Sequence, residues 1–389
     1  MDFSFPKEYQ LLRRMIREFV ENEIVPVAAR IDEEEQVPFE VLEKAAEVGI
    51  MGVPFPQEYG GMGAGEMGYC ILMEEIGKVC TSTAAVIGAH IGLCGMAIYL
   101  DGTPEQKEKY LRPLATGQKY GAFALTEPGA GSDAAGIKMR ATRTGSGDWV
   151  LNGSKIYITN GPIADIITVL AVTDPALGAR GGITAFIVEK EFEGFQVGTV
   201  EDKMGIRGSA TSELIFDEVV VPAVNVIGRV GEGFITFMKT LDLGRITIGA
   251  ASLGGAERAL EMAVEYARLR EQYGAPIAHK QSVQFMIADM DAEIEMLRSM
   301  VYRTAWMVDT GRRFTREAGI CKLMGSEIAS RCINRTLQIH GALGYSRDFP
   351  LERMFRDARI GEIFEGTNEI QRIVIAGDIF RAAGVRIRP

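Results

Sequence analysis

Residues 120–136 read YGAFALTEPGAGSDAAG and mark the point at which the chain changes its periodicity. Before them, from residue 5 to about residue 118, apolar residues recur at helical spacing and are interrupted by prolines and glycines. After them come short runs rich in β-branched and aromatic residues, at 166–172, 183–188 and 214–221. The sequence therefore predicts a helical segment followed by a mostly antiparallel β domain.

Helical periodicity returns after Pro222 and Gly228, and the helices become longer. Apolar residues step by three and four along 253–267 and again along 283–301, with a short loop at 273–280 between the two stripes. We therefore expect an α+β multidomain fold. Its parts are an N-terminal all-α domain (1–119), a central antiparallel β-barrel-like domain (120–230) and a C-terminal four-helix bundle (231–389).

The composition excludes several classes of function. Apolar residues make up 47% and charged residues 24% of 389 residues, which allows a large buried core. The chain has 52 acidic and 42 basic residues, so its net charge is −10, which disfavours a nucleic acid partner. Five cysteines without Cys-x-x-Cys spacing and three histidines without His-x-x-x-His spacing predict buried thiols in a reducing compartment and no metal site.

No signal peptide is expected, because Met1 is followed by Asp2, Phe3 and Pro6 and then by an amphipathic helix. Residues 80–100 contain no charged side chain and have the length of a membrane span. They are rich in Thr, Ser, Gly and Ala and lack flanking anchors, so a buried core helix is the better interpretation. We expect a cytoplasmic bacterial or archaeal protein, with the mitochondrial matrix as the alternative for a processed chain.

The segment GAGEMG, residues 63–68, matches the dinucleotide-binding fingerprint letter for letter. That fingerprint has meaning only between a strand and the helix that follows it. Here it follows PFPQEY, which does not resemble a strand, and the chain does not alternate strands and helices. We therefore do not expect a Rossmann site.

The motif ALTEPGAGSDAAG suggests a site for a flat or phosphorylated ligand. Gly129 and Gly131 allow the backbone to approach such a ligand closely, and Thr126 and Ser132 add hydroxyl groups. By composition alone, a glycine-rich turn capped by Ser132 and Asp133 is the better explanation of the same residues.

The motif KIYITNG, residues 155–161, places Tyr157 and Thr159 on one face of a strand. An aromatic ring beside a hydroxyl group suits the edge of a flavin, although an ordinary strand has the same pattern.

The third motif is GEIFEGTNEIQR, residues 361–372. A carboxylate at Glu365, between Phe364 and Gly366, would be partly desolvated, which raises its pKa toward the range of a general base. Ordinary acidic residues at the start of a helix, stabilised by its dipole, would give the same pattern at Glu365 and Glu369.

Together and in this order, the three motifs resemble those of the acyl-CoA dehydrogenase family. The resemblance runs through nearly the whole chain. It includes VPFPQEYGGMG (53–63), KMGIRGSAT (203–211), RLREQYG (268–274) and QIHGALGY (338–345). The flanking sequence looks most similar to that of short-chain or butyryl-CoA dehydrogenases.

The resemblance implies an FAD enzyme that desaturates an acyl-CoA thioester, with the α-proton passing to Glu365 and the β-hydride to flavin N5. Flavin contacts within the chain would come from Phe123, Leu125, Thr126, Gly131, Ser132, Tyr157, Thr159, Thr367 and Glu369. Contacts with the flavin of a neighbouring subunit, in a homotetramer, would come from Arg270, Tyr273, Gln281, Gln338 and Gly341. The substrate would contact Ser132, Asp242, Arg245 and Gly366. Electron-transfer flavoprotein would be the electron acceptor.

Two departures and one choice refine this expectation. Ala342 replaces a common glycine, and Glu369 replaces a common glutamine. Isovaleryl- and long-chain-type relatives carry the base at the position held here by Gly244, whereas this chain has the short- and medium-chain arrangement with Glu365. A glutamate introduced at 244 should therefore rescue part of the activity of Glu365→Gln.

Two alternatives to a dehydrogenase stay open at this point. A flavin oxidase on the same scaffold would use oxygen as its acceptor, although acyl-CoA oxidases are usually longer and nitroalkane oxidases have Asp in place of Glu365. A non-catalytic protein that binds acyl-CoA or assists assembly would not need the intact base and flavin motifs.

Overall fold

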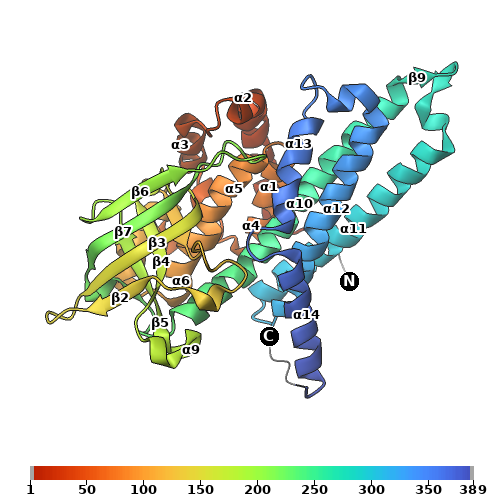
Figure 1. Cartoon of the computed structure of the whole chain (residues 1–389). Helices are drawn as coiled ribbons and strands as arrows, with labels where there is room; N and C mark the ends of the chain where they lie inside the picture. Colours follow the sequence, from red (N-terminus) through yellow and green to blue (C-terminus); the bar gives the residue numbers. More distant parts are fainter. Residues whose placement is uncertain (1–3, 386–389) are drawn as a thin grey trace.

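The computed structural model describes residues 4–385 and divides into three regions along the chain (Figure 1). The first region is helical and lies behind the sheet, with its helices coloured red to orange. Its main helices are α1 (Lys7–Phe19), α2 (Ala28–Glu33), α3 (Phe39–Glu47), α4 (Gly65–Gly77), α5 (Thr81–Gly88), η5 (Ala89–Gly95), α6 (Met96–Asp101), α7 (Pro104–Gln106), η6 (Lys107–Leu111) and α8 (Arg112–Ala115).

The structure confirms the predictions for the two ambiguous N-terminal segments, residues 63–68 and residues 80–100. α4 begins at Gly65, and the element before it is a short 3-10 helix, η4 (Gln57–Tyr59), so the GAGEMG segment does not follow a strand. The continuous helix Thr81–Asp101 is long and apolar enough to cross a membrane by length and composition. Because 78% of its most apolar 18-residue stretch is buried inside the protein, it is a core helix. All five cysteines are buried and free.

The central region is one eight-stranded sheet with the order β6-β7-β3-β2-β4-β5-β8, and β1 pairs with β4. Most neighbours are antiparallel, as expected, but β4 pairs in parallel with both β1 and β2, so the sheet is mixed. The strands are β1 (Gly121–Ala124), β2 (Arg140–Arg143), β3 (Trp149–Thr159), β4 (Ile166–Val172), β5 (Ile183–Glu189), β6 (Phe195–Val200), β7 (Thr211–Val221) and β8 (Val226–Ile227).

The third region consists of long helices whose predicted apolar stripes are buried. α10, α11 and α12 pack against one another, and α14 joins them by packing on α12. A small hairpin lies between α10 and α11 and marks the far tip of this bundle (Figure 1). The elements are α10 (Gly233–Leu269), β9 (Glu271–Gln272), β10 (Ala275–Pro276), α11 (Gln281–Asp309), α12 (Thr315–His340), α13 (Leu351–Ala358), η12 (Arg359–Glu362) and α14 (Asn368–Ala382).

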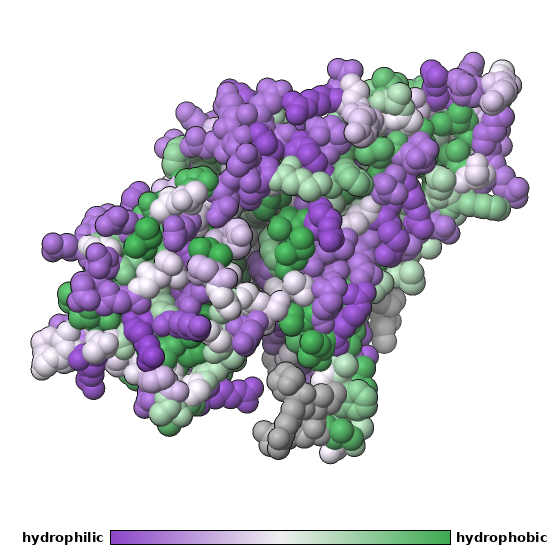
Figure 2. All heavy atoms as spheres, viewed as in Figure 1, coloured by the Kyte–Doolittle hydropathy of each residue, from purple (hydrophilic) through white to green (hydrophobic). Residues whose placement is uncertain are grey.

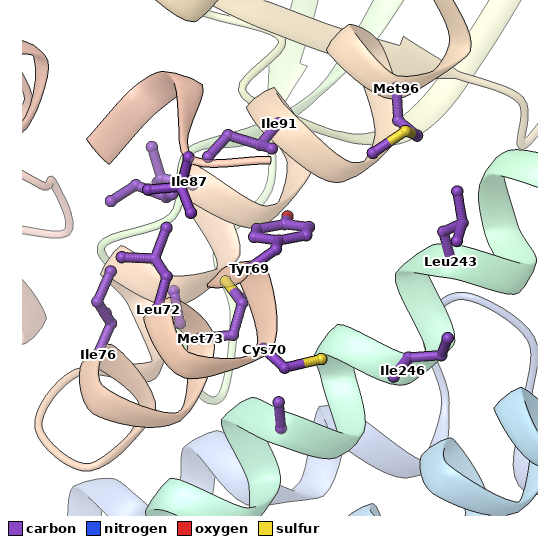
Figure 3. Packing of buried hydrophobic residues seen from close by; sticks show 14 of the residues in the cluster. Tyr69, Cys70, Leu72, Met73, Ile76, Ile87, Ile91, Met96, Leu243 and Ile246 are labelled. Carbon is purple, nitrogen blue, oxygen red and sulfur yellow. The ribbon is translucent and has the colours of Figure 1, made fainter. Parts of the chain in front are cut away.

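The crossing of α4 and α10 joins the N-terminal region to the bundle. Figure 3 shows Tyr69 and Cys70 of α4 beside Leu243 and Ile246 of α10 in the shared hydrophobic core. The backbones approach closely because glycines lie at the crossing: a Cβ on Gly254 would lie 2.0 Å from the carbonyl oxygen of Glu74. This contact fixes α10, which carries Gly244 and Arg245, against the helices that precede the sheet.

Candidate active site around Glu365

Glu365 lies in the loop between η12 and α14, and its backbone is held in an unusual conformation. Its φ is +49°, in the left-handed region that residues other than glycine rarely adopt. Gly366 follows with a φ of +91°. Gln371 Nε2 donates to the carbonyl oxygens of Gly366 at 2.9 Å and of Glu365 at 3.4 Å. Thr367 caps α14 by accepting from the backbone N–H of Ile370. Such strain persists only where surrounding contacts enforce it, and it concentrates at functional sites.

The carboxylate of Glu365 has the environment of a general base. Its Oε2 is buried and has no hydrogen-bond partner among the described residues. Burial raises the pKa of Glu365 to about 7, while the positive charges of Arg245 and Lys322 act in the opposite direction. The sequence predicted partial desolvation, and the structure gives a carboxyl group poised to exchange a proton near neutral pH.

Gly244 on α10 faces this carboxylate directly. A Cβ at Gly244 would lie 2.4 Å from Glu365 Oε2 and 3.4 Å from Leu93 Cδ2. Any side chain at this position would therefore displace the carboxylate of Glu365. The absence of a side chain at 244 and the acid at 365 are two aspects of one arrangement.

Three of the predicted substrate contacts also lie around Glu365. Arg245 is buried next to Gly244, and its Nη1 donates to Asp242 Oδ1 at 2.5 Å. A Cβ on Gly366 would be 3.9 Å from Arg245 Nη2, so the loop that carries Glu365 lies beside the guanidinium. Burial raises the pKa of Asp242, and Arg245 opposes this shift. The fourth predicted contact, Ser132, lies on an exposed loop of the β region.

The predicted flavin motifs form an exposed surface at β3. A bulge between Lys155 and Ile158 interrupts the strand, and Tyr157 has a φ of +57° with 62% of its surface exposed. Without this bulge, alternation would place Lys155 and Tyr157 on the same face. Instead Tyr157 points to solvent and Thr159 is half-buried beside it.

Lys155 fixes the neighbouring end of β1 from inside the protein. Its Nζ donates to Glu127 Oε1 at 2.7 Å and to the carbonyl oxygen of Leu125 at 3.0 Å. The backbone N–H of Ile156 donates to the carbonyl oxygen of Thr126 at 2.9 Å. The two predicted motifs are therefore joined by direct bonds, which the sequence alone did not indicate.

The other residues predicted to contact the flavin in this region are either in an open loop or buried in the core. Side chains added at Gly129 or Gly131 would meet nothing within 4 Å, so the loop is open to an approaching ligand. Phe123, by contrast, is buried in the core, and its ring stacks on Phe237 with the centroids 4.0 Å apart. Its side chain therefore does not join the surface that carries Tyr157.

The residues expected to reach a neighbouring subunit lie elsewhere. In Figure 1 the hairpin at β9 is at the opposite end of the molecule from the sheet. The ends of α10 and α12 meet there, because the rings of Tyr266 and His340 stack 4.1 Å apart. All five residues of this group are exposed: Arg270, Tyr273, Gln281, Gln338 and Gly341. Within one chain the structure does not bring them to Tyr157 or Glu365. Thr367 and Glu369, however, lie close to Glu365 at the start of α14.

The family models for the acyl-CoA dehydrogenase N-terminal, middle and C-terminal domains match residues 6–118, 122–219 and 231–380 in succession. The chain belongs to the acyl-CoA dehydrogenase family. Members of this family are FAD-dependent oxidoreductases. The exposed ring of Tyr157, the open backbone at Gly131 and the nearby hydroxyls of Thr126 and Thr159 fit such a cofactor.

Individual relatives are similar over their whole length. The short-chain specific acyl-CoA dehydrogenase of Clostridium acetobutylicum is 47% identical over 381 residues, covering 98% of this chain and all of the relative. The caffeyl-CoA reductase-Etf complex subunit CarC of Acetobacterium woodii is 41% identical over 379 residues, covering 97% of this chain and 99% of the relative. The structure of butyryl-CoA dehydrogenase from Megasphaera elsdenii superposes with a TM-score of 0.96 at 43% identity, covering 98% of this chain and all of that one.

Several residues of this acyl-CoA dehydrogenase site carried no signal in the sequence. Lys322 and Asn368 bond to each other close to the Glu365 loop, and Gln371 bonds the carbonyl oxygen of Gly366 in that loop. A lysine in the middle of an amphipathic helix usually predicts a solvated face. Only the packing of α12 against both α10 and α14 shows that Lys322 is buried.

Proposed function

We propose that this protein removes the α-proton of a short-chain acyl-CoA with Glu365 and forms the 2-enoyl-CoA. The observation that carries the proposal is the buried, unpartnered Oε2 of Glu365 opposite Gly244. Among the three relatives compared, the two named for dehydrogenation are short-chain or butyryl-CoA enzymes, which supports a short acyl group.

The residues around Glu365 suit proton abstraction from a thioester. With a pKa of about 7, close to half of the Glu365 side chains are ionised at neutral pH and able to accept the α-proton. The backbone N–H of Glu365 has no hydrogen-bond acceptor among the described residues, so it is free to donate to the thioester carbonyl as negative charge develops there. Bound FAD supplies the two-electron acceptor for the β-hydrogen.

The other predicted contacts are assigned to binding. Tyr157, Thr159, Leu125, Thr126, Gly131 and Ser132 would hold the flavin, with Thr367 and Glu369 near the base. Arg245 and Asp242 would hold the CoA thioester next to Glu365, because Arg245 places a buried positive charge beside the loop at Gly366.

We propose a homotetramer in which the tip of one bundle completes the flavin site of a neighbour. Support comes from exposed apolar side chains on the helices of the bundle, which Figure 2 shows among the charged residues on its right side. Exposed large side chains of the C-terminal region include Tyr273 in the hairpin, at 95% exposure, and Phe285, Met296, Ile373 and Phe380 on the helices. We also propose that the electrons pass to an electron-transfer flavoprotein, because a relative is a subunit of an Etf complex. The protein is proposed to be cytoplasmic.

The visible spectrum of the purified protein tests the proposal. We expect a yellow protein with about one FAD per chain, bleached under anaerobic conditions by butyryl-CoA more rapidly than by long-chain thioesters. A colourless protein that cannot take up FAD would refute the function. Reoxidation by oxygen as rapid as reoxidation by electron-transfer flavoprotein would favour an oxidase instead.

Glu365→Gln serves as the matched variant, since it keeps the size of the side chain and removes the proton acceptor. It should retain the flavin and lose the bleaching. Near-normal bleaching of this variant would show that another group is the base.

A further inference from the structure

Lys322 is a buried lysine that the proposed chemistry does not use. It lies in the middle of α12, and its side chain has no exposed surface. Its Nζ donates to Asn368 Oδ1 at 3.0 Å, and no carboxylate among the described residues lies within ion-pair distance of it. Burying an ammonium group without a paired carboxylate is costly, so its presence here calls for a compensating role.

Asn368 connects Lys322 to the loop of the base. It is the first residue of α14, three positions after Glu365, and its Nδ2 donates to Ser326 Oγ at 3.0 Å. One turn later, Gln371 of the same helix bonds the carbonyl oxygens of the loop. Lys322 and Ser326 of α12 therefore hold the beginning of the helix that positions Glu365.

The charge of Lys322 also acts on Glu365. The charged and titratable groups around the carboxylate are Arg245 from α10, Lys322 from α12 and the Tyr69 phenol from α4. Burial lowers the pKa of Lys322 to about 8, and Glu365 is the strongest of the nearby charges that oppose this shift. Glu362 and Glu369 act on Lys322 in the same direction more weakly, and Arg245 acts against them.

Arg245 differs from Lys322 because Asp242 already pairs with its guanidinium. Lys322 has a neutral partner, the amide of Asn368, so its charge is not offset by a bonded carboxylate. Arg245 acts on Glu365 more strongly than Lys322 does, and Lys322 adds a second positive charge that favours the ionised carboxylate.

We propose that Lys322 is a positioning residue for the base: it fixes the start of α14 through Asn368 and adds to Arg245 a second buried positive charge that favours the ionised form of Glu365. This inference rests on the proposed function of Glu365. In this role Lys322 acts on the reaction through Glu365 and the loop that carries it.

Three substitutions separate the charge from the hydrogen bond. Lys322→Gln keeps a donor for Asn368 and removes the charge, Lys322→Met removes both, and Lys322→Arg keeps the charge. Ser326→Ala is the matched control, since it removes the second bond to Asn368 and leaves the ammonium in place.

Two measurements on the holoenzyme compare these variants with the wild type. The first is the pH dependence of the anaerobic rate of flavin reduction by butyryl-CoA in stopped flow. The second is an infrared titration of the Glu365 carboxyl group without substrate, in protein with isotopically labelled glutamate, with the band identified by its loss in Glu365→Gln. Thermal melts show whether each variant folds.

Loss of the charge should raise the midpoint of both titrations by about one pH unit in Lys322→Gln and Lys322→Met. The rate at pH 7 should then fall about fivefold and recover at higher pH, because the ionised fraction falls from about a half to about a tenth. Lys322→Arg should restore the midpoint, and Ser326→Ala should leave it in place.

An unchanged midpoint in folded Lys322→Gln, with a rate lowered equally at every pH, would overturn the proposal and leave Lys322 a structural residue. Normal flavin reduction by Glu365→Gln would instead refute the base itself. The two failures are therefore distinguishable.

Discussion

Moving the base from residue 365 to residue 244 tests the arrangement of the active site. The sequence suggests placing glutamate at Gly244 in a Glu365→Gln background. The structure shows that this background is unsuitable, because a Cβ at 244 would lie 2.4 Å from the end of the side chain at 365. Glu365→Gly removes that collision, and the φ of +49° at this position also favours glycine.

The expected magnitudes follow from this geometry. Removing the general base should slow flavin reduction by about 10²- to 10⁴-fold, or about 3–5 kcal/mol in the activation barrier. A glutamate at 244 starts from a different backbone position, and a misplacement of about 1 Å can cost about 10²-fold. The double variant Gly244→Glu/Glu365→Gly should therefore regain about 10- to 100-fold over Glu365→Gly and stay below wild type.

Anaerobic stopped flow with butyryl-CoA measures both rates, and the flavin absorbance before mixing shows that FAD is retained. Gly244→Glu with wild-type Glu365 is the control and should be impaired, because the two side chains compete for one space. A folded, flavin-bound double variant that reduces its flavin no faster than Glu365→Gly would refute the reasoning that both positions serve the same α-carbon.

Three further predictions concern the cofactor, the pH dependence and the core. Arg270→Ala should weaken FAD retention and tetramer formation together, measured by flavin content and size-exclusion chromatography; full retention of both would contradict the inter-subunit site. Because burial raises the pKa of Glu365 to about 7, the rate of flavin reduction should rise about tenfold per pH unit below 7 and level off above it, and a flat profile between pH 5 and 8 would exclude Glu365 as the titrating base. Lys155→Met leaves Glu127 buried without its ion-pair partner, so the free energy of unfolding should fall by about 3–5 kcal/mol in denaturant titrations, whereas Lys109→Met at an exposed pair should cost less than about 1 kcal/mol. Equal losses for the two lysines would contradict the importance of burial.

The site was predictable where its chemistry is local in sequence. The segment GEIFEGTNEIQR already contains the acid, the glycine that follows it and the helix cap at Thr367. The pairing of Gly244 with Glu365 was also predicted from the resemblance to relatives. The distances around Glu365 and the burial of its Oε2 atom were not predicted, since they depend on α10 and α12 packing around a loop far away in sequence.

The sequence by itself determined the order of helical and β regions, the buried nature of helix Thr81–Asp101, the family and its cofactor. These features follow from periodicity and from motifs within single segments, which act over a few residues. The domain boundaries at 119/120 and 230/231 stay a prediction. Only the tertiary structure decided that β4 pairs in parallel with β1, that Phe123 packs on Phe237 and that Lys322 is buried and bonded to Asn368. Each of these depends on contacts between distant segments, whose pairing no local pattern specifies.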